Sequence, residues 1–184
     1  MILMEDFFII GTGILLLSII ISLCFKLKIT KLFFYNSFLI YIIIVLAITL
    51  CPIPYEQAEF IYPVPNNFIP FKTIVSTLKF GITLTAFVQI FGNILISVPY
   101  GIFLGIMNNT RKHKHSTIIL LLLTLLFPLV VELLQFFIGI VIGVMYRSID
   151  IDDLILNIFG VILGIILCKI IFHYSLKLRD KKNV

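Results

Sequence analysis

Residues 117–145 have the sequence TIILLLLTLLFPLVVELLQFFIGIVIGVM and contain one ionisable side chain, that of Glu132. As a single helix, these 29 residues would be about 43 Å long, which is more than the roughly 30 Å hydrocarbon core of a bilayer requires. Either the helix ends early, at Gly139 or Gly143, or it is strongly tilted. In both cases the stretch predicts a membrane-spanning helix.

Four further apolar runs accompany this one, and the expected spans are roughly 7–25, 33–51, 82–107, 117–138 and 153–173. Of the 184 residues, 61% are hydrophobic and only 12% are charged, and the mean hydropathy is +1.20. This composition excludes a water-soluble domain. We therefore predict an all-α integral membrane protein of about five transmembrane helices, forming a single transmembrane domain over residues 1–184.

The charged residues predict the orientation of the spans. Basic residues gather in three short segments, at 26–31, 111–114 and 177–182, and five spans place all three on one side of the membrane. The positive-inside rule makes that side cytoplasmic, so the N-terminus is expected outside and the C-terminus inside. Most of the basic residues behind the net charge of +5 lie in these clusters, where they orient helices and meet lipid headgroups, so we expect no nucleic-acid binding.

The longest connection, from Pro52 to about Gly81, falls on the outer side and contains five of the seven prolines. Its first half is expected to be partly rigid and not helical. In its second half, apolar and polar residues occupy opposite faces at helical spacing, which predicts a short helix lying in the outer interface. The apolar face would hold Phe71, Ile74, Val75 and Leu78, and the polar face Lys72, Ser76 and Lys79.

Glu132 is expected about 22 Å into its span, in the outer third of the bilayer. Gln135 lies three residues further on and therefore shares its helix face. A buried acid at this depth needs a partner inside the bundle, and Arg147, the only arginine on the outer side, is the one we expect. The alternative is a neutral, hydrogen-bonded glutamic acid that only holds helices together.

A second polar group begins with the segment RSIDIDD at residues 147–153. In the helix that follows, Asp153, Asn157, Gly160 and Gly164 lie along one stripe, and the two glycines form a GxxxG pair that favours close helix packing. Helix capping would explain one or two of the aspartates. Their spacing matches no calcium-binding loop, and we predict no metal site.

The third span contains a row of small and polar residues at every fourth position: Thr85, Gln89, Asn93, Ser97, Gly101 and Gly105. Such a row drifts by about 40° per step, so about three consecutive members are expected to share a face. The glycines suit helix packing, whereas Asn93 suits either packing or ligand binding. No recognised catalytic or cofactor-binding motif occurs in a polar setting, so catalysis has no support from motifs and no cofactor is expected.

Three segments together resemble the VanZ-like family: NNFIPFKTI, GNILISVPYGIFLG, and VELLQ followed by RSIDIDDLILNIFGVILG. The likeness covers about residues 66–166, in the last three spans and the outer loop. The residues that carry it as a structural motif are Asn67, Pro70, Phe71, Pro99, Gly101, Gly160 and Gly164. The resemblance implies a bacterial cell-envelope protein of the cytoplasmic membrane. The founding member of the family is associated with resistance to the glycopeptide teicoplanin, and no biochemical activity is settled for the family.

These observations favour a non-enzymatic protein that contacts membrane lipids and binds a lipid-linked cell-wall precursor or a glycopeptide at the outer leaflet. The expected ligand-binding residues are Asn93, Glu132, Gln135, Arg147, Asp150, Asp153 and Asn157. One alternative is an intramembrane enzyme that acts on a lipid-linked substrate through Glu132 and the Asp150–Asp153 cluster. Another is a small carrier or channel subunit lined by Gln89, Asn93 and Glu132.

Overall fold

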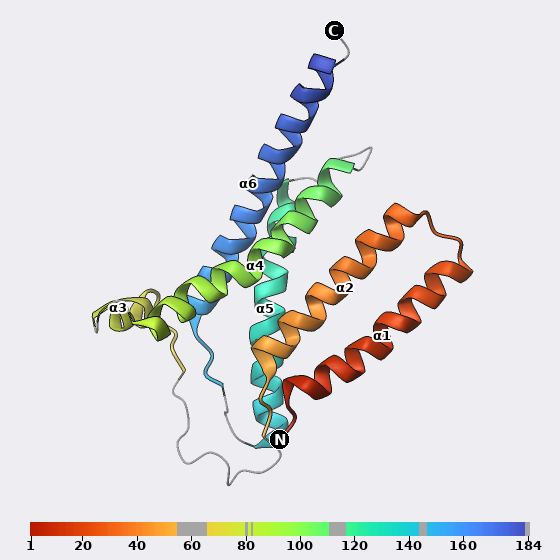
Figure 1. Cartoon of the computed structure of the whole chain (residues 1–184). Coiled ribbons are helices and arrows are strands. Elements are labelled where there is room, and N and C mark those ends of the chain that lie inside the picture. Colours follow the sequence, from red (N-terminus) through yellow and green to blue (C-terminus); the bar gives the residue numbers. More distant parts are fainter. Residues whose placement is uncertain (55–65, 80, 82, 111–116, 144–146, 183–184) are drawn as a thin grey trace. The chain divides into compact units, whose positions relative to one another are not determined.

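The computed structural model describes residues 1–54, 66–79, 81, 83–110, 117–143 and 147–182. Its elements are helices: α1 (Met4–Cys24), α2 (Ile29–Leu50), α3 (Lys72–Lys79), α4 (Leu84–Thr110), α5 (Thr117–Ile142) and α6 (Ile151–Lys182) (Figure 1). All except α3 are long and apolar enough to cross a membrane. The prediction of an all-α membrane protein with five spans and one short helix is confirmed. The proline-rich segment 55–65 and the basic segment 111–116 lie outside the described residues.

α5 ends at Ile142, and the next residue explains why. Gly143 has a φ of +78°, in the left-handed region that glycine adopts without steric cost, and its N–H donates to the carbonyl oxygen of Ile140 at 3.1 Å. Of the two glycines considered from the sequence, Gly143 therefore ends the helix, whereas Gly139 lies inside it.

The chain divides into two compact units, of which the first comprises residues 1–65 and 131–149. There α1 and α2 lie side by side, and a Cβ on Gly11 would come within 2.5 Å of the Ile43 side chain (Figure 1). Ile2 and Ile53 exchange backbone hydrogen bonds of 2.8 and 3.0 Å. A small apolar cluster surrounds this bridge; its members are Ile2, Phe7, Leu46, Leu50, Ile53, Ile138 and Ile142.

The second unit comprises residues 66–130 and 150–184, and its centre is the close pair of α4 and α6 (Figure 1). A Cβ on Gly101 would lie 2.0 Å from the carbonyl oxygen of Val161, and one on Gly164 would lie 2.1 Å from that of Val98. Both of these are backbone atoms, so the two main chains approach each other directly at the glycines. Gly160 makes the same kind of approach, to the carbonyl oxygen of Ile94 at 2.2 Å.

The row of small residues on α4 follows α6 over a longer distance than expected. Asn93, Ser97, Gly101 and Gly105 all lie against α6, although only about three consecutive members were expected to share a face. A row at every fourth position is inclined to the helix axis, so a partner helix that crosses at a matching angle stays over it. Pro99 lies inside α4, between Ser97 and Gly101 in the sequence.

Candidate functional site

The start of α6 is joined to the segment before α3 by Asn67. The carbonyl oxygen of Asn67 accepts a hydrogen bond from the N–H of Ile151 at 3.0 Å, and its side-chain amide donates to Oδ1 of Asp150 at 2.8 Å. The same Oδ1 atom accepts the N–H of Asp152 at 2.9 Å, so Asp150 caps the helix that it precedes. Asn67 and Asp150 are both buried. The segment around Asn67 and the segment around Asp150, which are far apart in the sequence, are thus joined by hydrogen bonds.

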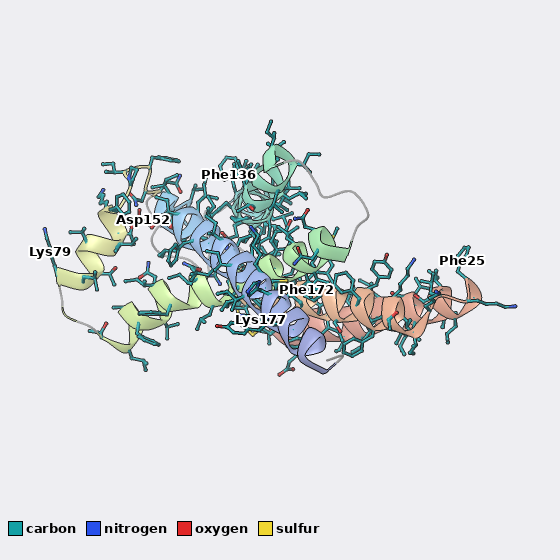
Figure 2. All side chains as sticks on the ribbon, turned by 90° about the horizontal axis from the view of Figure 1, so that it is seen from above. Phe25, Lys79, Phe136, Asp152, Phe172 and Lys177 are labelled. Atoms are coloured by element: carbon teal, nitrogen blue, oxygen red, sulfur yellow. The ribbon has the colours of Figure 1, made fainter. Side chains whose placement is uncertain are left out.

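Asp152 caps a different helix, α3. Its side chain is 0% exposed, and its two carboxylate oxygens accept hydrogen bonds from the backbone N–H groups of Phe71, Thr73 and Ile74, the last two at 2.8 and 3.1 Å. Figure 2 shows Asp152 at the start of α6 beside α3, with Lys79 at the other end of α3. One carboxylate therefore satisfies three of the N–H groups that the first turn of α3 would leave without a partner.

The backbone of Phe71 explains why this carboxylate is needed. Phe71 has a φ of +65°, a conformation that residues other than glycine rarely adopt and that costs on the order of 1 kcal/mol or more. The turn is held from both sides, because Pro70 restricts its own φ and the N–H of Phe71 donates to Asp152. The IPF element of the sequence is thus the entry to α3.

Further along the α4–α6 pair, two side-chain hydrogen bonds connect the helices. Asn93 donates to Oδ1 of Asp153 at 2.6 Å, and Ser97 donates to Oδ1 of Asn157 at 2.8 Å. Ser97 and Asn157 are buried. In both pairs the partners are 60 residues apart in the sequence. The two helices therefore keep the same register over this polar part of their contact.

In the first unit, one side chain from α5 and one from the segment after it donate hydrogen bonds to carbonyl groups at the end of α2. Gln135 donates to the carbonyl oxygen of Thr49 at 2.9 Å, and Arg147 donates to that of Cys51, also at 2.9 Å. Helices leave their last carbonyl groups without intrahelical partners, and these two side chains supply the missing donors. Arg147 was also expected to pair with the buried Glu132, and that pairing stays a prediction.

The thiol of Cys51 lies at the same helix end. Burial raises its pKa above the usual value, the negative charge of Asp6 raises it further, and the positive charge of Arg147 opposes both effects. The thiol is therefore protonated at neutral pH, which makes Cys51 a poor nucleophile.

The residues expected to bind a ligand are distributed over both units. Glu132, Gln135 and Arg147 belong to the first unit. The second unit holds Asn93, Asp150, Asp153 and Asn157, each of which is hydrogen-bonded to a partner in the fold. Ligand binding by these residues stays a prediction. Asp152 and Ser97 were missing from the predicted set; the IDIDD run and the four-residue row were the signals that pointed to them.

α3 turns one face to the protein and the other outward. Thr73, Ile74 and Thr77 line a narrow crevice whose other walls come from α4 and α6, including Gln89 and Asp153. Ile74, which was expected on the apolar face together with Phe71 and Val75, is the half-buried member of that set and lies toward the protein. The outward face is formed by the exposed residues Phe71, Lys72, Val75, Ser76, Leu78 and Lys79.

Across the described ranges, no group of three or more His, Cys, Asp and Glu side chains is arranged to hold a metal ion. The five long apolar helices define a multi-pass α-helical membrane protein. A family model for VanZ/LLP1 matches residues 38–172, so the chain belongs to the VanZ/LLP1 family. This match begins inside α2 and is longer than the likeness seen in residues 66–166. Searches of curated proteins and of solved structures gave no match.

Proposed function

We propose that this protein is a non-enzymatic component of the bacterial cell envelope that binds a lipid-linked cell-wall precursor or a glycopeptide at the outer leaflet and thereby influences antibiotic resistance. The observation that carries the proposal is the attachment of α3. The buried Asp152 holds this helix against α6, while Phe71, Val75 and Leu78 stay exposed. An amphipathic helix fixed in this way presents its outward face at a constant place in the interface.

The contacts of the acidic cluster favour binding over catalysis. Asp150 and Asp152 accept hydrogen bonds that start α6 and α3, and Asp153 accepts one from Asn93. Asp152 accepts three hydrogen bonds through both of its carboxylate oxygens, which leaves little room for a substrate proton. A binding surface needs such a residue only as a rigid support.

Arg147 is one of the predicted ligand-binding residues, and substituting it tests that role. We expect Arg147→Gln to remove most of the change in teicoplanin susceptibility that the wild-type chain produces in a susceptible host, because an anionic ligand group would lose its charged partner. Glutamine can still donate to the carbonyl oxygen of Cys51, so the fold should be kept. The measurement is the minimum inhibitory concentration at matched amounts of protein in the membrane.

Arg147→Lys is the matched control, because it keeps the positive charge. Equal susceptibility of cells with the wild type and with Arg147→Gln would remove Arg147 from the ligand site. The function itself is tested with the purified wild type in lipid nanodiscs. If these bind neither a lipid-linked cell-wall precursor nor teicoplanin, the proposed function is wrong.

The proposal also requires a defined orientation, with α3 outside and the C-terminus in the cytoplasm. We expect a fluorescent reporter that matures only in the cytoplasm to be active when fused after residue 184. A reporter active only in the periplasm or outside the cell should be active when placed before Met1. The reverse pattern would put α3 at the inner leaflet and contradict the proposal.

A further inference from the structure

The outward face of α3 is divided into two parallel strips. Lys72, Ser76 and Lys79 are spaced at i, i+4 and i+7, which places them along one line of the helix. Phe71, Val75 and Leu78 have the same spacing one residue earlier, so they form a second line beside the first. All six side chains are exposed. α3 therefore presents a cationic strip next to an apolar strip.

A shallow hollow of about 350 Å³ lies over these two strips. Its lining residues are Pro70, Phe71, Lys72, Val75, Ser76 and Lys79. The hydroxyl of Ser76 donates to the carbonyl oxygen of Thr73 at 2.9 Å, so its proton is already in use. The positive charge over the hollow thus comes from the two lysines, and its apolar wall comes from Phe71 and Val75.

The two lysines have no acidic partner among the described residues. No carboxylate of those residues lines the hollow, and neither Lys72 nor Lys79 forms an ion pair with one of them. Asp152 lies at the N-terminal end of α3, with both carboxylate oxygens bound to backbone N–H groups. The surface therefore favours a ligand that brings its own negative charge.

We infer that this hollow binds the phosphate-bearing headgroup of an anionic membrane lipid. Lys72 and Lys79 contact the phosphate, and the first part of the lipid chain lies along Phe71 and Val75. The apolar strip identifies a lipid as the occupant, because a free phosphate ion would gain nothing from it. The inference rests on the proposed function, which places α3 at the outer leaflet, and it names the headgroup chemistry that the protein recognises there.

The chain contains no tryptophan, so a single one can report on the lipid next to α3. Leu78→Trp places this reporter on the apolar strip outside the lining of the hollow. The full-length protein is reconstituted with mixtures of phosphatidylglycerol and phosphatidylcholine, one of which carries brominated chains that quench fluorescence on contact. We expect about a tenfold preference for phosphatidylglycerol, and we expect Lys72→Gln/Lys79→Gln in the same background to abolish it.

Lys28→Gln/Lys31→Gln is the matched control, because it removes the same charge elsewhere and should leave the preference intact. Lys72→Arg/Lys79→Arg keeps the charge and should also retain it. The inference is overturned if the Leu78→Trp protein shows no preference, if the glutamine pair on α3 retains it, or if the control pair loses it equally. Abolition by millimolar inorganic phosphate would assign the hollow to a soluble anion and reject the lipid.

The same reconstituted samples separate this inference from the proposed function. Binding of a lipid-linked cell-wall precursor or teicoplanin is measured alongside the quenching. A preference for phosphatidylglycerol without binding of either ligand supports the hollow and rejects the proposed function. Ligand binding without that preference supports the function and rejects the hollow.

Discussion

Replacing Gly101 by alanine is expected to prevent α4 and α6 from packing together. The new Cβ would lie 2.0 Å from the carbonyl oxygen of Val161 and 2.9 Å from the Cα of Gly164. Both are backbone atoms, so no change of side-chain rotamer can make room and the helices must separate. Separation also breaks the hydrogen bond between Ser97 and Asn157. We expect a loss of about 3 kcal/mol, in the upper part of the range for overpacked cores.

Gly92→Ala is the matched control in the same helix. A Cβ at Gly92 would meet only Val88, at 4.0 Å, so the same added methyl group fits without any shift. The midpoint of thermal unfolding in detergent is measured by size-exclusion chromatography of heated samples. It should fall sharply for Gly101→Ala. For Gly92→Ala it should stay constant or rise slightly, because alanine favours helix over glycine. A normal midpoint for Gly101→Ala would show that the helices do not approach closely there.

The sequence predicts that a helix face packs closely more readily than it predicts which helix packs against it. The four-residue spacing of Ser97, Gly101 and Gly105, and the GxxxG pair at Gly160, each identify a face that another helix can approach. Spacing within one helix carries no information about which other helix that is. The constant offset between α4 and α6 depends on both backbones and on the partners of Asn93 and Ser97. It is therefore a property of the fold and not of either segment.

The same distinction applies to the candidate site. An aspartate before a helix predicts a cap on that helix, and this local rule describes Asp150. It does not describe Asp152, which caps α3 because the pairing of Asn67 with Asp150 brings the two helix starts together. Likewise, Arg147 donates to a carbonyl group at the end of α2, a contact between distant segments that charge pairing did not predict.

Asp152→Ala is expected to release α3 while the α4–α6 pair remains folded. The change leaves the backbone N–H groups of Phe71, Thr73 and Ile74 without their acceptor. Each such group costs about 1–3 kcal/mol when it stays buried, so the first turn of α3 should open to reach water instead. The contacts of Gly101 and Gly164 lie further along the helix pair and do not involve Asp152.

Hydrogen exchange measured on peptides that cover residues 71–79 should detect this opening. We expect exchange at least tenfold faster than in the wild type, because the loss of an acceptor worth about 1.4 kcal/mol or more raises the open population by that factor. Asp152→Asn keeps one side-chain oxygen and should give an intermediate rate. Asp153→Ala is the neighbouring control: it removes the hydrogen bond to Asn93 but leaves the cap of α3 in place. Equal exchange in Asp152→Ala and the wild type would mean that α3 holds its place without the carboxylate, and the fixed interfacial surface on which the proposed function rests would then need another support.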